Sequence, residues 1–211
     1  MIHFSVRDPV SAHLLGATRG QQTIGPLLAQ ISHRPNEELI VVLDFTGVEA
    51  ANASFLKATA FHLFLCGRLF ANSSSRPVTN ESEFSPKPFN VFPVFANLGP
   101  DVADEMTEVF QGRGFPFVEA LSWSDDLLNQ MRVRGHIEPA MREAILVLDG
   151  KKDVTATELS RGTQSPSIAP TAWNNRLADL NLNRLARRRR QGKHWHYSLI
   201  AERTQLWACG T

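Results

Sequence analysis

The chain has little cysteine, and this scarcity excludes several architectures. Its 211 residues contain only two cysteines, Cys66 and Cys209, which lie far apart in the sequence. Two isolated cysteines are too few for a disulfide framework or for a zinc site built on thiolates. Cys66 stands in an apolar run, so we expect it to pack in the core as a small hydrophobic side chain.

Long apolar runs are also lacking. None approaches the roughly 20 residues that a membrane-spanning helix needs. The first residues, 1–7, show no basic region followed by an apolar stretch and a small-residue cleavage site, so secretion is not expected. The sequence therefore predicts a cytoplasmic protein without a membrane partner.

The residue clusters that carry catalysis are missing from the sequence as well. No group of acids and histidines stands together, and no glycine-rich loop could cradle a phosphate. His194 and His196 alternate along one segment, but two histidines without a third ligand are a weak metal site. We therefore expect no enzymatic activity, no metal and no cofactor.

What the chain does have is an uneven distribution of charge. The composition, with 43% hydrophobic and 20% charged residues, is that of an ordinary globular protein. Residues 1–150 contain 11 lysines and arginines against 17 acids, whereas residues 151–200 contain 10 against 3. This asymmetry indicates a basic module for a polyanion joined to an acidic module with another task.

The acidic part has the pattern of alternating strands and helices. Strands are predicted where apolar residues alternate or run together, at 2–7, 39–45, 90–96 and 115–121. Helices are predicted between them, starting at Pro26, at Phe55 and at Gly99-Pro100. Pro93 indicates an edge or bulged position for its strand. The order β-α-β-α-β-α-β predicts a layered α/β domain.

Two further segments complete the prediction for this part. Residues 71–90, rich in serine and proline, are expected to form an exposed loop. Residues 122–134 are expected to form a short linking helix. The expected organisation is an α/β domain over 1–121, a linker helix within 122–138 and a second domain over 139–211.

The first domain resembles the STAS-like family, bacterial relatives of the anti-sigma-factor-antagonist fold. The resemblance rests on the strand that ends in Asp44-Phe45-Thr46-Gly47-Val48, on the helix entry Ala53-Ser54-Phe55-Leu56 and on the later Val94-Phe95-Ala96-Asn97-Leu98-Gly99. It implies a sensing or protein-docking domain. Phosphorylation at Ser54 is one reading of the helix entry, and the alternative is that Ser54 only caps the helix. Asp44 is read as a carboxylate that orders the loop.

The basic part reads as three helices. Apolar residues 141, 145 and 148 share one face of a first helix that begins at Pro139. Thr155 and Glu158 have the spacing of a capping box at the start of a second helix. In the third helix, Trp173, Leu177 and Leu180 form one stripe. Thr171, Asn174, Asn175 and Ala178 fall on the opposite face, where amides and the neighbouring Arg176 could read base edges.

Two strands joined by a tight glycine turn follow the third helix. The first strand contains the arginines 187–190, and the turn Gln191-Gly192-Lys193 leads into His194 and the second strand. The segment 139–200 resembles bacterial winged helix-turn-helix regulators, in which such a hairpin is the wing. The family usually has glycine at the exit of the recognition helix, where this chain has Asn183, a residue that tolerates the left-handed conformation. We expect Trp173 and Trp195 to belong to the core.

These features predict a sequence-specific regulator that binds double-stranded DNA as a homodimer, with the first domain as sensor or partner-docking module. The expected DNA-binding residues are Thr171, Asn174, Asn175, Arg176, Arg187, Arg188, Arg189, Arg190, Lys193 and His194. The alternative is a non-enzymatic adaptor or phospho-switch that uses the winged helix against protein or RNA.

Overall fold

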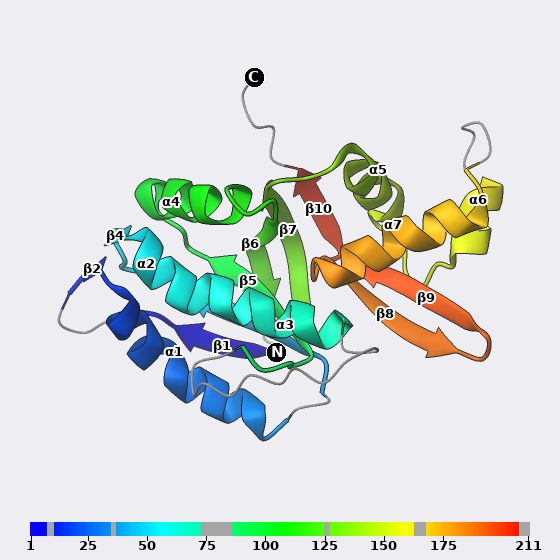
Figure 1. Ribbon diagram of the computed structural model, residues 1–211. Coiled ribbons are helices and arrows are strands. Elements are labelled where there is room, and N and C mark those ends of the chain that lie inside the picture. The colour runs from blue at the N-terminus through cyan, green and yellow to red at the C-terminus, as the bar shows by residue number, and fades with distance from the viewer. Residues whose placement is uncertain (8–10, 35–36, 73–85, 125–126, 163–167, 207–211) are drawn as a thin grey trace.

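The computed structural model describes residues 1–7, 11–34, 37–72, 86–124, 127–162 and 168–206, and it has a mixed α/β fold. Its centre is a six-stranded sheet in the order β1-β3-β5-β6-β7-β10 (Figure 1). Neighbouring strands are parallel except for the pair β6 and β7. The strands are β1 Ile2–Ser5, β3 Leu39–Asp44, β5 Val91–Ala96, β6 Pro116–Ser124, β7 Leu127–Gly135 and β10 Arg203–Leu206.

Helices cover the first face of this sheet. They are α1 Ala17–Ser32, the continuous run of α2 Ala53–Leu56, η1 Lys57–Phe61 and α3 His62–Asn72, and α4 Pro100–Gln111. Alternate residues of β3, including Val41 and Leu43, pack against them in one core. Two short strands, β2 His13–Leu14 and β4 Ala50–Ala51, pair beside α1 and α2.

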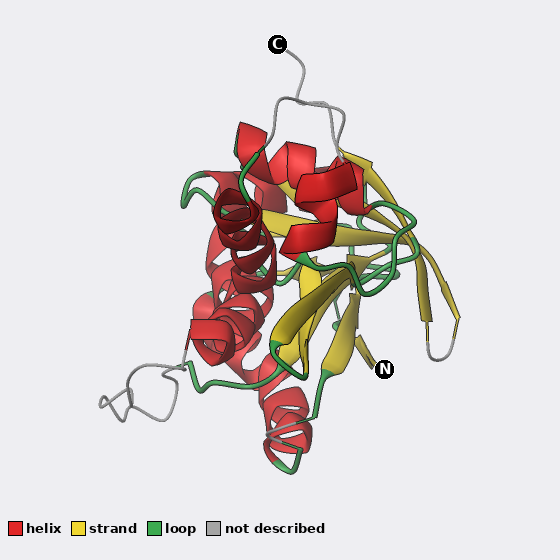
Figure 2. Ribbon diagram, turned by 90° about the vertical axis from the view of Figure 1, so that its right-hand side faces the viewer, coloured by secondary structure: helices red, strands yellow, loops and turns green. Residues whose placement is uncertain are grey.

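The C-terminal elements cover the second face. They are α5 Pro139–Leu148, α6 Ala156–Gly162, α7 Pro170–Leu182 and the hairpin of β8 Ala186–Gln191 and β9 His194–Leu199 (Figure 2). Ile40 and Val42 of β3 share a second core with Trp173 and Leu177 of α7. The two predicted domains are therefore packed together through the sheet.

The predicted linker helix over 122–138 is wrong, because residues 127–135 form strand β7. A bulge in the pairing of β6 and β7 explains the error: Leu128 and Met131 are three residues apart, yet both are buried in the second core. A spacing of three imitates a helix. The predicted boundary between residues 121 and 122 falls within β6.

Two predictions that depended on proline also need correction. Helix α1 begins at Ala17, not at Pro26, and contains Pro26 in its interior. Proline leaves one backbone carbonyl of the preceding turn without its helical donor, but Pro26 is exposed, so water can bind that carbonyl. Strand β5 is central, but β6 pairs with it only at Phe95 and Ala96. The backbone groups of Pro93 and Val91 point to the edge that faces β6, and there Arg184 donates a hydrogen bond to the Val91 carbonyl. The sheet therefore does not need the N–H donor that Pro93 lacks.

Several elements agree with the prediction. The strands near residues 2–7, 39–45, 90–96 and 115–121 are present, and so are the helices that follow residues 52 and 99. Most of the loop predicted at 71–90 lies outside the described residues. No helix in the described ranges is long and apolar enough to cross a membrane.

Candidate nucleic-acid interface

Helix α7 presents a polar face away from the core. Trp173, Leu177 and Leu180 are fully buried, as the stripe predicted. Thr171, Asn174 and Asn175 are exposed on the other side. Both amides can thus donate and accept hydrogen bonds at the surface, which is the chemistry needed to read a base edge.

The start of α6 is fixed by the predicted capping box. The Thr155 hydroxyl accepts a hydrogen bond from the Glu158 amide at 3.2 Å, and the Thr155 amide donates to Glu158 Oε2 at 2.7 Å. The hydrogen bond from the Thr155 backbone is the main reason that the pKa of Glu158 is lowered. Reciprocal capping holds this helix end in place.

The beginnings of α6 and α7 and the turn of the β8–β9 hairpin enclose an open groove of about 300 Å³. Thr171 and Asn174 line it from α7, and Lys193, His194 and Trp195 line it from the hairpin. The structure therefore brings together four of the predicted DNA-binding residues, although they come from two segments of the sequence.

Trp195 lies on the face of the hairpin that borders this groove. Arg190 stands opposite Trp195, and Arg188 stands opposite Tyr197. The Arg188 guanidinium lies 3.8 Å from the centre of the Trp195 ring, which is a cation–π distance. Trp195 is 37% exposed, so the prediction that it belongs to the core is wrong, whereas Trp173 is core. Tyr197, nearer the base of the hairpin, takes the buried position.

The other face of the hairpin is turned toward the sheet. Arg187 Nε lies 3.0 Å from Glu38 Oε1, and an Arg189 Nη atom lies 3.2 Å from the same oxygen. Glu38 directly precedes β3. These two predicted DNA-binding arginines are therefore paired with the N-terminal part of the chain rather than gathered at the groove.

Arg176 is also engaged elsewhere. Its guanidinium donates to Glu143 of α5 at 2.7 Å and lies 5.3 Å from the centre of the Trp173 ring. It joins α7 to α5, which suits a structural role. The left-handed residue at the exit of α7 is Arg184, with φ of 59°, and not the expected Asn183.

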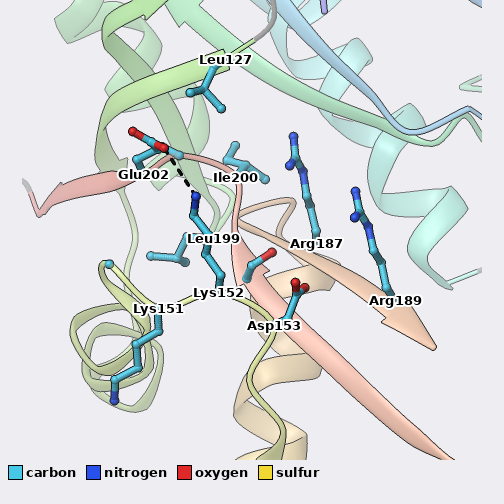
Figure 3. Close-up of a pocket in the computed structure, with 12 residues that line it drawn as sticks. Leu127, Lys151, Lys152, Asp153, Arg187, Arg189, Leu199, Ile200 and Glu202 are labelled. Carbon is cyan, nitrogen blue, oxygen red and sulfur yellow. Dashed lines mark ion pairs between the residues drawn. The ribbon is translucent and has the colours of Figure 1, made fainter. Parts of the chain in front are cut away.

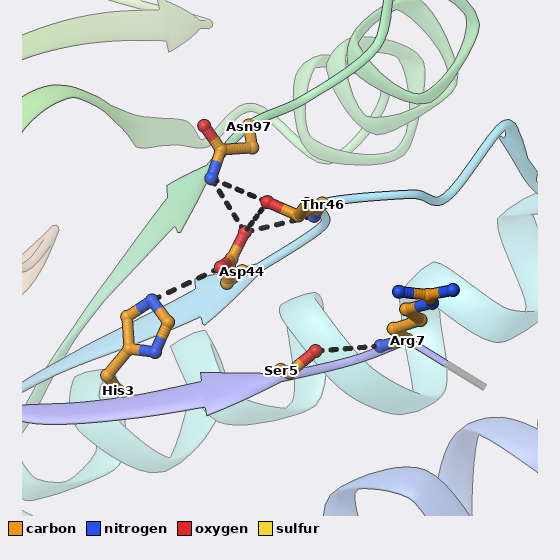
Figure 4. A network of polar contacts seen from close by, with 6 residues as sticks. All are labelled: His3, Ser5, Arg7, Asp44, Thr46 and Asn97. Carbon is orange, nitrogen blue, oxygen red and sulfur yellow. Dashed lines mark hydrogen bonds and ion pairs between the residues drawn. The ribbon is translucent and has the colours of Figure 1, made fainter. Parts of the chain in front are cut away.

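A polar network occupies the carboxyl ends of β1, β3 and β5 (Figure 4). Asp44 Oδ1 accepts hydrogen bonds from the Thr46 amide and hydroxyl and from Asn97 Nδ2, at 2.7–2.9 Å. Asp44 Oδ2 lies 3.3 Å from His3 Nε2. Burial alone would raise the pKa of Asp44, but these hydrogen bonds outweigh it and lower the pKa. The carboxylate orders the loop after β3, as the sequence suggested.

Ser54 is exposed on α2, but it is not the residue that caps this helix. Asn52 takes that role, because its side-chain oxygen accepts hydrogen bonds from the amides of Phe55 and Gly16, both at 3.0 Å. The hydroxyl of Ser54 remains available to a modifying enzyme or a partner. Among the described residues, no group of three or more histidine, cysteine or acidic side chains could hold a metal ion.

The sequence interpretation missed Glu38, Arg184 and the exposure of Trp195. No local sequence pattern indicates Glu38 or Arg184, because each contacts a segment far away in the chain. Trp195 lies at the groove because the buried part of the hairpin ends before this residue, which the sequence pattern does not indicate. Comparison with protein-family models, with curated proteins and with solved structures finds no match to this chain.

Proposed function

We propose that this protein is a sequence-specific transcriptional regulator that binds double-stranded DNA through a winged helix-turn-helix formed by its C-terminal part. The observation that carries the proposal is the groove in which Thr171 and Asn174 of α7 face Lys193 and His194 of the hairpin turn. A duplex seated there would meet base-reading amides and cations together.

The order of elements supports this reading. Helix α5 is followed by an extended residue, Val154, which pairs with Tyr197 of β9. Helices α6 and α7 and the β8–β9 hairpin come next. A helix, a short strand, two helices and a hairpin, in this order, are the parts of a winged helix, with α7 as recognition helix and the turn at Gly192 as wing tip.

The placement of charge narrows the proposed contacts. Arg190, Lys193 and His194 lie near the groove, whereas Arg187 and Arg189 are paired with Glu38 and Arg176 with Glu143. We therefore assign phosphate contacts to Arg190 and Lys193 and base contacts to Thr171, Asn174 and Asn175. Arg188 positions Trp195 at the groove.

The STAS-like part would be the sensor or docking module, with Ser54 as its candidate modification or partner site. A homodimer on DNA is part of the proposal, because one recognition helix covers few base pairs and paired half-sites raise specificity. Sedimentation with and without duplex tests this, and a monomer under both conditions contradicts it. The proposed location is the cytoplasm, with no cofactor and no catalytic activity.

Binding to a labelled random-sequence duplex, followed by fluorescence anisotropy over a range of salt concentrations, tests the proposal. We expect wild-type affinity to fall steeply with salt, because phosphate contacts release counterions. The double variant Arg190→Gln/Lys193→Gln should bind every duplex more weakly, and its log–log salt slope should be shallower by about 2.

A matched control removes two charges elsewhere, at the exposed side chains of Lys57 and Lys87. Lys57→Gln/Lys87→Gln changes the net charge equally but should leave the slope unchanged. Equal weakening by both double variants would contradict a localised interface. Absence of duplex binding by the wild-type protein would reject DNA binding and favour the adaptor alternative.

A further inference from the structure

We propose that a cavity between the β8–β9 hairpin and the central sheet binds a small anionic ligand with a short apolar body. The cavity measures about 220 Å³ and is separate from the groove at the recognition helix. Figure 3 shows its lining, which comes from the start of β7, the turn after α5, both strands of the hairpin and the segment that follows β9.

Cationic side chains line this cavity. Arg187 and Arg189 extend side by side from β8, and Lys152 reaches in from the turn after α5 (Figure 3). Two acids also line the cavity: Glu202, which pairs with Lys152 at 3.6 Å, and Asp153. Lys151 also belongs to the lining, but it points away from the other cations.

The two arginines share a single carboxylate. Both approach the same oxygen of Glu38, so one negative charge faces two guanidinium groups, each with five N–H donors. The side chain of Arg187 is only 26% exposed and that of Glu38 only 23%. Water is thus partly excluded at this group, where two guanidinium charges face one carboxylate, and this strengthens the attraction of the arginine pair for an anion.

Apolar side chains also line the cavity. They are Leu127 of β7, and Leu199 and Ile200 at the end of the hairpin. The Ser198 hydroxyl adds a neutral hydrogen-bonding group. A phosphate monoester with a ring-sized apolar body matches this mixed lining, because paired arginines bind phosphate oxygens through parallel hydrogen bonds while the ring packs on leucine and isoleucine.

The position of the cavity suggests what binding would do. Its walls belong both to the central sheet, through Leu127, and to the hairpin, through Arg187 and Arg189. An anion held by these arginines would compete with Glu38 and would tie the hairpin to β7. The ligand would therefore act on the hairpin that carries Lys193 and His194, and this makes the cavity an effector site, an assignment that rests on the proposed function.

Isothermal titration calorimetry of the full chain with three probes tests the site. Phenyl phosphate has the anionic head and the apolar body, inorganic phosphate has only the head, and phenol has only the body. We expect saturable binding of phenyl phosphate at a ratio of one per chain, with inorganic phosphate weaker and phenol undetectable. No saturable binding of phenyl phosphate up to about 10 mM would overturn the proposal.

Variants assign the binding to the cavity. Arg189 is 59% exposed, so Arg189→Gln should fold normally and should weaken phenyl phosphate binding by about tenfold, the value of a charge-assisted hydrogen bond. Arg190→Gln is the matched control, because it removes the same charge from the next position of the same strand but on the opposite face. An equal loss in both variants would show non-specific attraction and would overturn the assignment.

The variant Glu38→Gln tests whether affinity for phenyl phosphate can also be increased. Removing the competing carboxylate should tighten phenyl phosphate binding about threefold or more, whereas weaker binding would contradict competition at the arginines. None of these titrations contains DNA. Failure of the cavity proposal therefore leaves the duplex-binding assay unaffected, and failure of duplex binding leaves these titrations valid.

Discussion

Arg184 Nε donates a hydrogen bond of 2.8 Å to the carbonyl oxygen of Val91, a residue 93 positions earlier in the chain. A second nitrogen of the same guanidinium donates to Asn90 Oδ1 at 2.9 Å, and the group lies 3.7 Å from the centre of the Phe92 ring. Arg184 is only 2% exposed. One buried side chain thus joins the end of α7 to the central sheet.

Replacing Arg184 by methionine should lower the free energy of unfolding by about 1–3 kcal/mol, because two buried acceptors lose their donors. Chemical denaturation followed by circular dichroism measures the change. Arg203→Met, an exposed site on β10, is the control and should change stability by less than about 0.5 kcal/mol. An unchanged midpoint for Arg184→Met would show that water replaces the lost hydrogen bonds.

Gly67→Ala should destabilise the protein, although alanine normally favours a helix over glycine by about 1 kcal/mol. A Cβ atom at Gly67 would lie 2.5 Å from the Val91 carbonyl oxygen and 3.2 Å from Arg184 Nε. The overlap should cost about 1–3 kcal/mol. Thermal unfolding measures it, with Gly162→Ala as the comparison, since a Cβ atom there would meet no other atom of the described residues within 4 Å. A stabilising Gly67→Ala change would mean that α3 and β5 are farther apart.

Asn174→Ala should alter which sequences are bound more than it alters average affinity, because an exposed amide in the groove would contact base edges rather than phosphates. Selection from a random duplex pool, followed by sequencing, compares the preferred sites of variant and wild type. The loss at the affected base pair should be about 1–3 kcal/mol. Gln22→Ala, exposed on α1, should select the wild-type site. The same selected site for Asn174→Ala would remove this residue from the interface.

Cys66 should remain unreactive in the folded protein. Burial raises the pKa of its thiol to about 12, so almost no thiolate exists at neutral pH. In a Cys209→Ser background, a thiol reagent should label Cys66 only after unfolding. Labelling at the rate of a free thiol in native buffer would contradict the burial.

The same shift in pKa predicts a dependence of stability on pH. Between the ordinary thiol pKa of 9.0 and about 12, the unfolded chain has lost the proton that the folded chain keeps. The free energy of unfolding should therefore fall with rising pH, by up to about 1.4 kcal/mol per unit from this group. Urea titrations at several alkaline pH values, compared with Cys66→Ala in the same background, isolate this contribution.

Local patterns predicted those parts of the fold that local interactions determine. The capping box of Thr155 and Glu158 and the buried stripe of Trp173, Leu177 and Leu180 needed only the spacing of neighbouring residues. The continuous apolar run of β3 needed only its length and its β-branched content. The polar face of α7 followed from the same periodicity, and the hairpin that carries Lys193 and His194 followed from its glycine turn, so residues from both parts of the candidate groove could be predicted.

Contacts between distant segments could not be predicted in this way. The pairing of Arg189 with Glu38 spans 151 residues, and nothing near either residue indicates it. Four consecutive arginines read as one basic patch, but the pleat of a strand sends them to two opposite faces. The prediction of a linker helix was wrong for a related reason: the bulge in β7 depends on its pairing with β6, and no local sequence pattern indicates it.

The return of the chain to β10 has a consequence for dissecting the molecule. Because β10 pairs with β7, residues 139–199 are an insertion between two neighbouring strands rather than an appendix at the end of the chain. A fragment ending at residue 138 would lose an edge strand and would leave the backbone of β7 open to intermolecular pairing. Excision of the insertion would need a longer replacement, because β7 and β10 are parallel and the chain must return along β7 before it enters β10. Such a crossover takes about a dozen residues or more.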